Sequence, residues 1–302
     1  MKCLIICGPT ATGKTRLAAE IAKEFNGEVI SADSRQVYRR VDIGTGKDKP
    51  RGVKIWGYDL VEPDEEFSVA DFVAFTWSII ERLGRKNKLP IVVGGTGLYL
   101  KSLFEPPESL GVKADKKLRK KLGVLDIKQL QEELGRVAPE RFRQMNWSDK
   151  HNPRRLIRAI EVANYHLRGV HAATSEVKNR RGVIYDALWI GLTADRSMLE
   201  KRIRRRVEER AGGGMSVEVK RLMQKYSDWT LPAFSATGYH EWREYLMGKI
   251  SRQEAIEQWQ RSEQQYAARQ MTWFKKQPYI YWFDIGDKNW HNKINRLVNK
   301  WR

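Results

Sequence analysis

Apolar residues gather in two patterns along the chain, as short unbroken runs and as longer stretches with helical spacing. The unbroken runs predict buried strands, and apolar positions three or four residues apart predict amphipathic helices. Strands are expected at 2–7, 28–31, 89–93, 185–192 and 279–283. Helices are expected from residue 17 and from Pro153, and at 68–83, 127–134, 197–210, 251–274 and 290–301. This alternation is typical of an α/β fold with a parallel sheet flanked by helices.

One segment departs from the alternation. Pro106 and Pro107 break the chain, and the stretch to residue 150 is rich in lysine, arginine and leucine without a strand pattern. We predict a small all-helical insertion domain at 109–150, inserted in a core formed by 1–108 and 151–302. A solvated helical excursion without a partner would carry the same charge. Residues 42–52 are polar and glycine-rich, and are expected to form a mobile loop on the active face.

The turn after the first strand carries a phosphate-binding motif. Its residues fit the pattern G-x-x-x-x-G-K-[ST] between a strand and a helix. Glycines let successive backbone N–H groups point inward, Lys14 adds a full charge, and the Thr15 hydroxyl is placed to ligate Mg²⁺. The alternative is a glycine-rich turn without a ligand. The motif indicates a diphosphate or triphosphate and does not specify a nucleotide. Its residues are Gly8, Pro9, Thr10, Ala11, Thr12, Gly13, Lys14 and Thr15.

A carboxylate follows the second strand. Asp33 lies just past residues 28–31, at the edge where open α/β sheets bind ligands. It is a candidate general base, a Mg²⁺ ligand, or only the cap of a following helix, and the local pattern does not choose among these roles. The strand at 89–93 is followed by Gly94, Gly95 and Thr96, where ATP-hydrolysing phosphate-loop enzymes usually place an acidic metal ligand. This weakens an ATPase interpretation.

The charge balance points to a polyanionic partner. The 302 residues include 56 Lys and Arg against 37 Asp and Glu, for a formal net charge of +19, with 11 Trp and 11 Tyr. Nucleic acid is the first candidate, although a basic surface alone gives the same balance. Arg154, Arg155 and Arg158 lie close together on one helical turn. Lys201, Arg202, Arg204, Arg205 and Arg206 are too crowded for all of them to face solvent, so one or two are expected to meet phosphate or RNA.

The cysteines and the hydropathy of the chain indicate the cellular compartment in which it is expected to work. Cys3 and Cys7 are the only two cysteines, and their spacing along one strand disfavours a disulfide. Reduced, buried cysteines fit the cytoplasm. No apolar run is long enough to span a membrane, and no signal-peptide pattern precedes the first strand.

Longer strings of residues carry a resemblance to a known family. They are GPTATGKT, SADSRQVYRRVDIGTGK, FSVADF, PIVVGGTGLYL, NPRRLIRAIEV, DRSMLEKRIRRRV, SATGYHEWREYLMGKIS and QYAARQMTWFKKQ, in the family's order. Together they resemble the tRNA dimethylallyltransferases, which act on the adenosine 3′ to the anticodon. The resemblance runs from residue 1 to about residue 285 and is least specific in the insertion.

The resemblance implies a fold related to the nucleotide kinases, with dimethylallyl diphosphate and Mg²⁺, not ATP, at the phosphate loop. It implies that Asp33 is the base that takes the proton from adenine N6, that Thr10 lies near the reacting phosphate beside Lys14, and that Arg202 and Arg206 help to bind the diphosphate. It also implies a cytoplasmic enzyme, expected to be a monomer, that binds the tRNA anticodon stem-loop. The residues expected to contact tRNA are Asp33, Ser34, Arg35, Gln36, Thr96, Arg119, Arg154, Arg155, Leu156, Ile157 and Arg158.

The chain departs from the family at several places, and two rival functions remain open. Trp56-Gly57-Tyr58-Asp59 stands where the family usually has a His-His pair, the insertion is short and lysine-rich, and residues 210–216 are glycine-rich. A nucleotide or small-molecule kinase on the same scaffold is the first rival, and it would need an acidic Mg²⁺ ligand and an adenine pocket. A non-catalytic RNA-binding protein is the second, and it would not need Asp33.

Overall fold

The first strand occupies the middle of the sheet, and the other strands are arranged around it. The computed structural model describes residues 2–107, 109–167 and 186–302. Residues 1–105 and 182–302 form one compact unit, which contains the sheet, and residues 106–181 form a second, helical unit.

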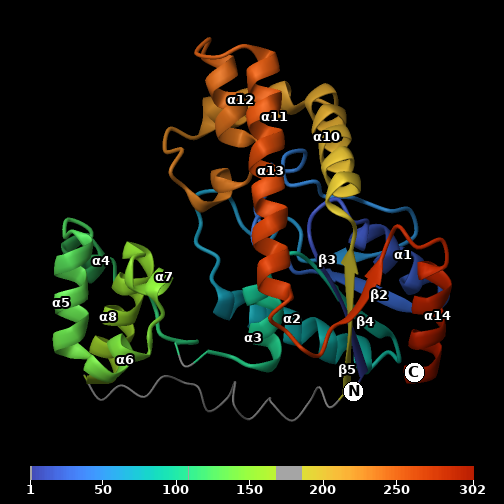
Figure 1. Ribbon diagram of the computed structural model, residues 1–302, viewed down its shortest axis with the longest axis horizontal. Coiled ribbons are helices and arrows are strands. Elements are labelled where there is room, and N and C mark those ends of the chain that lie inside the picture. Colours follow the sequence, from blue (N-terminus) through green and yellow to red (C-terminus); the bar gives the residue numbers. More distant parts are fainter. Residues whose placement is uncertain (1, 108, 168–185) are drawn as a thin grey trace. The chain divides into compact units, whose positions relative to one another are not determined.

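A six-stranded, entirely parallel sheet organises the larger unit (Figure 1). Its strands, in spatial order, are β3 (Ile55–Trp56), β2 (Gly27–Ser31), β4 (Leu89–Val93), β1 (Lys2–Cys7), β5 (Asp186–Thr193) and β6 (Tyr281–Asp284). The expected α/β class is confirmed. Five strands match the expected runs within two residues, although Tyr185, the first residue of the expected run at 185–192, lies outside the described residues. The sequence did not predict β3, because two residues carry no recognisable alternation.

Helices cover both faces of the sheet. On one face, α1 (Lys14–Glu24) and α14 (Trp290–Trp301) pack on alternate residues of the strands, such as Leu4 and Ile6 of β1. Next along the chain come α2 (Val69–Gly84), which begins at the expected capping box of Ser68 and Asp71, and α3 (Gly97–Phe104). Both lie against the opposite face in Figure 1. Because side chains alternate along a strand, Cys3, Ile5 and Cys7 are buried on that second face.

A group of helices stands over the carboxyl ends of the strands (Figure 1). It contains α10 (Arg196–Gly212), α11 (Met215–Lys225), the 3₁₀ turn η2 (Pro232–Ser235), α12 (Tyr239–Leu246) and α13 (Arg252–Phe274). Their shared core includes the fully buried Trp242 and Trp259. The sequence missed α11 and α12. The glycine-rich stretch at 210–216 ends α10 and begins α11, with Gly214 at a φ of +107°, where a side chain would be strained.

The loop at 42–47 is fastened, in contrast to the mobile loop that we expected. The Lys47 side chain is fully buried, and its ammonium group lies 2.6 Å from both Asp42 and Asp59. From α11, the Glu218 carboxylate accepts hydrogen bonds from the backbone N–H groups of Asp42 and Ile43, at 3.0 and 2.9 Å. Composition alone predicted a mobile loop because Glu218, which bonds its backbone, lies about 175 residues further along the chain.

The helical unit has its own core. Its helices are α4 (Lys116–Leu122), α5 (Ile127–Val137), α6 (Pro139–Gln144), α7 (Trp147–Lys150) and α8 (Pro153–Leu167). We expected the insertion to end at residue 150, but this unit continues through α8. The physical reason is the apolar stripe of α8, whose Leu156 and Ile160 are fully buried against Leu130 and Leu134 of α5.

A buried carboxylate joins three segments of the helical unit. The Glu161 side chain is 2% exposed, and it accepts two hydrogen bonds at 2.9 Å from Arg119 and a further bond from Arg158. It also accepts a bond from the backbone N–H of Asp115 at 2.6 Å. Burial alone would raise the pKa of Glu161, but the hydrogen bonds from the two arginines outweigh it and lower the pKa. The charged carboxylate therefore stabilises this unit.

We expect Glu161→Ala to destabilise the helical unit by about 2–4 kcal/mol, because it leaves two partly buried arginines without their shared partner. Native-state hydrogen exchange of the amides at 115–161 in the full chain measures this effect. Since the folded-state pKa lies below the ordinary value of 4.5, the contribution is complete above that pH and is lost on further acidification. The surface pair of Glu133 and Arg136 provides a control, and Glu133→Ala should cost less than about 1 kcal/mol. Equal protection in the two variants would contradict the role of Glu161.

Candidate active site

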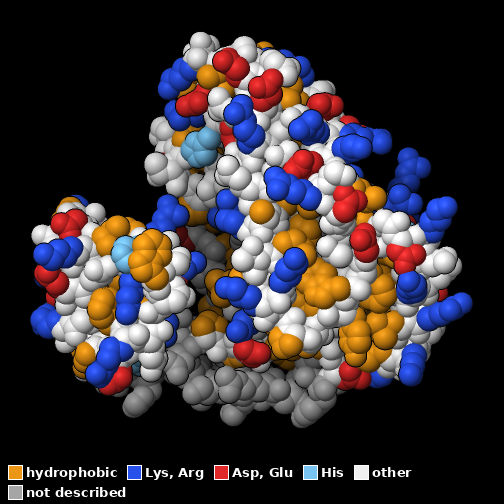
Figure 2. Space-filling model, in the orientation of Figure 1, with side chains coloured by type: hydrophobic (Ala, Val, Ile, Leu, Met, Phe, Trp, Pro, Cys, Tyr) orange, Lys and Arg blue, Asp and Glu red, His pale blue; other side chains and the backbone are white. Residues whose placement is uncertain are grey.

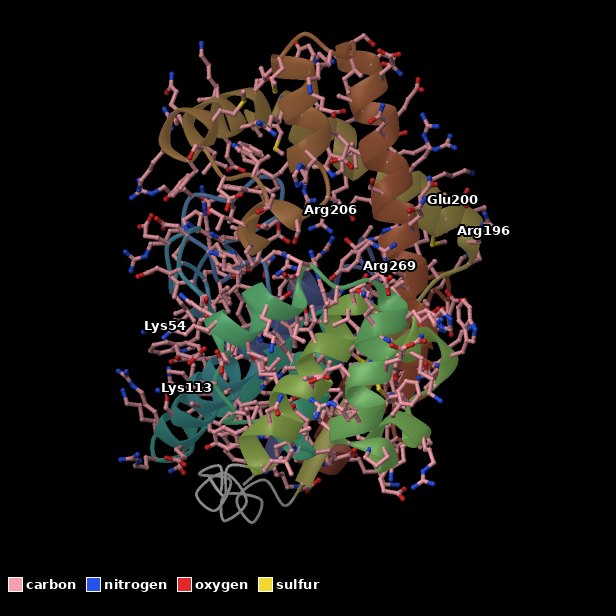
Figure 3. The ribbon with its side chains drawn as sticks, turned by 90° about the vertical axis from the view of Figure 1, so that its left-hand side faces the viewer. Lys54, Lys113, Arg196, Glu200, Arg206 and Arg269 are labelled. Carbon is pink, nitrogen blue, oxygen red and sulfur yellow. The ribbon has the colours of Figure 1, made fainter. Side chains whose placement is uncertain are left out.

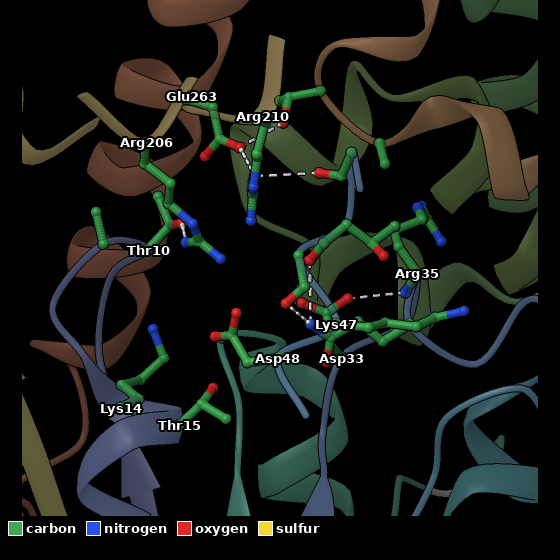
Figure 4. Close-up of a pocket in the computed structure, with 18 of the residues that line it drawn as sticks. Thr10, Lys14, Thr15, Asp33, Arg35, Lys47, Asp48, Arg206, Arg210 and Glu263 are labelled. Carbon is green, nitrogen blue, oxygen red and sulfur yellow. Dashed lines mark hydrogen bonds and ion pairs between the residues drawn. The ribbon is translucent and has the colours of Figure 1, made fainter. Parts of the chain in front are cut away.

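A cavity of about 1160 Å³ opens at the carboxyl ends of β1, β2 and β4 in the larger unit. Its floor is formed by the phosphate loop and the segment around Asp33, and α10 and α13 contribute its upper wall (Figure 4). Parallel sheets bind ligands at this edge because loops from neighbouring strands meet there. The position of the cavity therefore follows from the topology of the sheet.

The phosphate loop has the conformation that the motif predicts. Gly8 and Gly13 have φ angles of +128° and +89°, and a Cβ on Gly8 would lie 2.3 Å from the Leu192 carbonyl oxygen. The Thr12 hydroxyl is buried and donates to the Pro9 carbonyl at 2.9 Å. Thr12 therefore shapes the loop from within and does not face the cavity.

Cations converge on this loop. The Lys14 ammonium donates to the Pro9 carbonyl at 2.6 Å, and Arg206 donates to the Thr10 hydroxyl at 2.8 Å. Burial, followed by the nearby charge of Arg206, lowers the pKa of Lys14 to about 8. Arg202 and Arg205 also line the cavity. Three of the crowded cations of α10 thus line the cavity, and that at least one or two of them meet phosphate or RNA stays a prediction.

Asp33 lies on the side of the cavity opposite the phosphate loop (Figure 4). One of its carboxylate oxygens accepts a hydrogen bond from the backbone N–H of Arg35 at 2.8 Å, which closes a tight turn. No helix begins here, so the helix-cap alternative is wrong. Ser34 N–H donates to the Thr96 hydroxyl at 3.2 Å, which joins the ends of β2 and β4. Gln36 is 9% exposed and donates to the carbonyls of Thr45 and Gly46, so it acts as a support of the loop.

Residues of α13 that sequence reasoning did not assign complete the cavity. Gln270 accepts from the backbone N–H of Thr10 at 2.8 Å and donates to the Gly95 carbonyl at 3.1 Å. A Cβ on Gly95 would lie 1.9 Å from the Gln270 amide nitrogen, and a Cβ on Gly97 would lie 2.2 Å from the Trp273 ring. The strings GGTGLY and RQMTWF, distant in sequence, are thus in contact. The presence of both strings in the sequence was the signal that could have pointed to this contact.

Arg210 was also missed, because it lies one helical turn beyond the crowded stretch. Its guanidinium donates to the Gly44 carbonyl at 3.1 Å and to the Glu263 carboxylate at 3.3 Å, and Figure 4 shows it pointing into the cavity. The side chains of Arg210 and Glu263 are 11% and 7% exposed. Burial, and then the charge of Arg206, lowers the pKa of Arg210 to about 10. The cavity therefore holds several cations, and an anionic ligand would reduce the repulsion between them.

Oxygen donors suited to Mg²⁺ lie beside these cations. Thr15 lines the cavity as expected, and Figure 4 shows the Asp48 carboxylate on the same side as Lys14 and Thr15. Hydroxyl and carboxylate oxygens are the ligands that Mg²⁺ prefers, usually together with substrate phosphates. The described residues contain no cluster of three or more His, Cys, Asp or Glu side chains that would hold a metal alone. The donors fit a Mg²⁺ that binds together with a phosphate ligand.

The residues expected to contact tRNA from the helical unit divide by burial. Arg154 is exposed, and Arg155 is exposed and paired with Asp149. Arg119 and Arg158 are held by Glu161 as described above. Ile157 is partly buried, and Leu156 has no exposed surface and belongs to the core of this unit. The Leu156 side chain is therefore not available to RNA, and its assignment is corrected.

The fold and the cavity together define a phosphate-loop enzyme of the nucleotide-kinase-like class with a helical insertion. Comparison with known families matches residues 36–277 to the IPP transferase family and residues 1–55 to the isopentenyl transferase family. The chain belongs to the IPP transferase family.

Individual relatives agree with this membership. A tRNA dimethylallyltransferase of Thermoanaerobacter sp. (strain X514) is 38% identical over 99% of this chain and 96% of its own length. The enzyme of the same name from Acetivibrio thermocellus is 40% identical over 96% and 94%. The crystal structure of a tRNA isopentenylpyrophosphate transferase from Bacillus halodurans is 32% identical, covers 99% of this chain and 96% of its own, and superposes with a TM-score of 0.71. A eukaryotic dimethylallyltransferase acting on tRNA is 27% identical, covers 100% and 80%, and has a TM-score of 0.83.

Gly46 allows two arginines to approach the cavity, and we expect Gly46→Ala to weaken the binding of inorganic diphosphate. Gly46 has a φ of +62°, and a Cβ there would lie 1.7 Å from Arg210 and 2.5 Å from Arg206. Displacing a charge-assisted contact should cost roughly tenfold or more in affinity, measured by calorimetry with Mg²⁺. Gly52→Ala is the matched control, because Gly52 has a φ of +75° but nothing within 4 Å. Equal weakening by both substitutions would show that backbone strain, and not the arginines, controls binding.

The lowered pKa of Lys14 predicts a pH dependence of diphosphate binding. Lys14 is charged below about pH 8 and loses its proton as the pH rises through that value. The affinity advantage of the unaltered chain over Lys14→Met should therefore be large at pH 7 and shrink toward pH 9.5. Comparison of the two proteins cancels the titration of the diphosphate itself. A constant ratio of the two dissociation constants across this range would contradict the assignment.

Proposed function

We propose that this chain transfers a dimethylallyl group from dimethylallyl diphosphate to N6 of the adenosine 3′ to the anticodon in tRNA and releases diphosphate. The observation that carries the proposal is one cavity with a cationic phosphate loop on one side and the Asp33 carboxylate on the other, in a chain of the IPP transferase family. The relatives at 38% and 40% identity are named tRNA dimethylallyltransferases over nearly their whole length.

The phosphate loop would hold the diphosphate of the donor. Negative charge grows on the diphosphate as its bond to the allylic carbon breaks, so groups aimed at it lower the barrier more than they stabilise the bound substrate. The loop N–H groups, Lys14, Arg206 and Arg210 would have this role. Bound Mg²⁺ would add positive charge at the leaving group, and Thr15 and Asp48 are the residues that would hold it.

Asp33 would act on the acceptor. Adenine N6 is a weak nucleophile and is stacked in the anticodon loop, so the base must leave the stack to enter a pocket. N6 becomes acidic as its bond to carbon forms, and the Asp33 carboxylate would then take the proton. Thr96 and Ser34, at the adjoining strand ends, line the same edge of the sheet.

A phosphate-loop kinase is the less favoured alternative. A kinase would transfer phosphate from ATP, and the relatives found by comparison carry the name of a prenyl transferase instead. Incubation with Mg²⁺, tRNA and either dimethylallyl diphosphate or ATP separates the two activities. Nucleoside analysis of the tRNA should show an N6-prenylated adenosine, whereas phosphate transfer from ATP without prenylation would reject the proposal.

We also propose that the enzyme works as a monomer in the cytoplasm. Cys3 and Cys7 are both free and buried, and burial raises the pKa of each thiol to about 12, so neither is a reactive thiolate. No helix in the described part of the chain combines the length with the apolar character needed to cross a membrane. Sedimentation of the protein with and without tRNA tests the oligomeric state.

We predict that Asp33→Asn slows prenyl transfer by about a hundred- to ten-thousand-fold, the usual contribution of a positioned general base. The asparagine side chain can still accept the hydrogen bond from Arg35 N–H, so the turn and the fold should be retained. Single-turnover rates with prebound tRNA measure the effect, and unchanged binding of tRNA and inorganic diphosphate serves as the control. Transfer by Asp33→Asn at close to the original rate would remove Asp33 from the mechanism.

A further inference from the structure

Trp147 differs from every other tryptophan of the chain. Ten of the eleven are buried or partly buried, whereas Trp147, the first residue of α7, is 75% exposed. All eleven lie within the described residues. An indole exposed to this extent forgoes most of the free energy that its burial would gain, which makes its exposure informative.

A neighbouring side chain covers one face of the Trp147 ring and restricts its movement. The imidazole of His151 stacks on it with the ring centroids 4.2 Å apart and an interplanar angle of 23°. His151 Nδ1 lies 2.8 Å from the Trp147 carbonyl oxygen, and because a carbonyl only accepts, Nδ1 is the donor. One face of the indole is therefore covered and the opposite face is open. This arrangement leaves a flat aromatic surface with little freedom still to lose on binding.

The surroundings of this ring are basic. Residues 109–167 contain 14 lysines and arginines against 7 acidic residues, and Figure 2 shows blue side chains interspersed with exposed hydrophobic ones on this unit. Lys150 lies over the Phe142 ring at 4.7 Å, three residues from Trp147. Arg154, at the start of α8, is exposed, and among the described residues its side chain makes no hydrogen bond or ion pair. A polyanion with aromatic surface complements this combination better than an apolar protein surface does.

We propose that Trp147 is a stacking platform for an unpaired base of the RNA substrate, and that Arg154 binds a phosphate of the same strand. Every base has a flat face that stacks on an aromatic side chain, and the stack is worth about 1–3 kcal/mol. This inference rests on the proposed function for the identity of the partner as tRNA. It adds to that function a specific contact made by the helical unit.

The two contacts differ in their response to salt, which separates them in one experiment. Fluorescence anisotropy of a labelled anticodon stem-loop is measured with the full chain over a series of KCl concentrations. Trp147→Ala should weaken binding by about 5- to 150-fold with an unchanged salt slope, because stacking releases no counterions. Arg154→Gln should reduce the slope by about 0.7 to 0.9, the value of one phosphate contact. Trp147→Phe should recover much of the affinity.

Two controls make the test specific. Val124→Ala removes another exposed apolar side chain of the same unit, 83% exposed, and should leave binding unchanged. A blunt RNA duplex without a loop should bind the Trp147→Ala variant and the unaltered chain equally, because it offers no unpaired base.

Several outcomes would overturn the proposal. One is an unchanged affinity of Trp147→Ala for the stem-loop, and another is equal weakening of its binding to stem-loop and duplex. A third is a change of oligomeric state without a change in RNA binding, because it would show that this face is a protein interface. The experiment measures RNA binding, so it tests the stacking platform even if the unaltered chain transfers no prenyl group. Failure of the proposed function and failure of the platform are thus seen in different measurements.

Discussion

Crowding of positive charge at the phosphate loop is the constraint on which the site depends. Lys14, Arg206 and Arg210 all line the cavity, where burial first and then the charge of Arg206 lower the pKa values of Lys14 and Arg210. Each of the three cations has a fixed partner within the larger unit, namely the Pro9 carbonyl, the Thr10 hydroxyl, and the Gly44 carbonyl with Glu263. These partners compensate the repulsion only in part. A diphosphate would complete the compensation, so the resting arrangement already favours that ligand.

The segments that carry these groups are held by buried polar contacts of their own. Lys47 and Glu218 fasten the loop at 42–47, and Gln36 supports the same loop from the end of β2. Fastening matters because electrostatic stabilisation of a leaving group is effective when the dipoles and charges do not have to reorganise during the reaction. The buried Glu161 has the corresponding structural role in the helical unit, where it fixes Arg119 and Arg158 and leaves Arg154 exposed.

Local pattern predicted five of the six strands, the long helices and the phosphate loop, because each is marked by residues close together in the sequence. The capping boxes at Ser68 and Ser251 marked two helix starts correctly. Local pattern could not predict contacts between residues that are distant in the sequence. Glu218 acts on Asp42, and Gln270 on Thr10, across more than 170 residues, and no local periodicity reports such pairs. We predicted the end of the helical unit at residue 150 for a related reason. The apolar stripe of α8 predicts a buried helix face, but not whether that face packs in the core of the larger unit or of the helical unit. The resemblance to a family supplied Asp33, whose role the local pattern had left open.

One face of α13 explains how distant parts of the larger unit become a single site. Glu263, Tyr266, Gln270 and Trp273 follow one another at spacings of three and four residues, so they project from the same side of the helix. Glu263 orients Arg210, Gln270 bonds the phosphate loop, and Trp273 packs on Gly97 at the start of α3. Tyr266 is partly buried and lines the cavity, and its pKa is raised, first because burial disfavours its charged form and then because of the nearby charge of Asp33. A shift of this helix would therefore move groups on the phosphate-loop side and on the Asp33 side of the cavity together. In the transfer that we propose, both ends of the reaction would have to be aligned at once, and a single helix in contact with both sides suits that requirement.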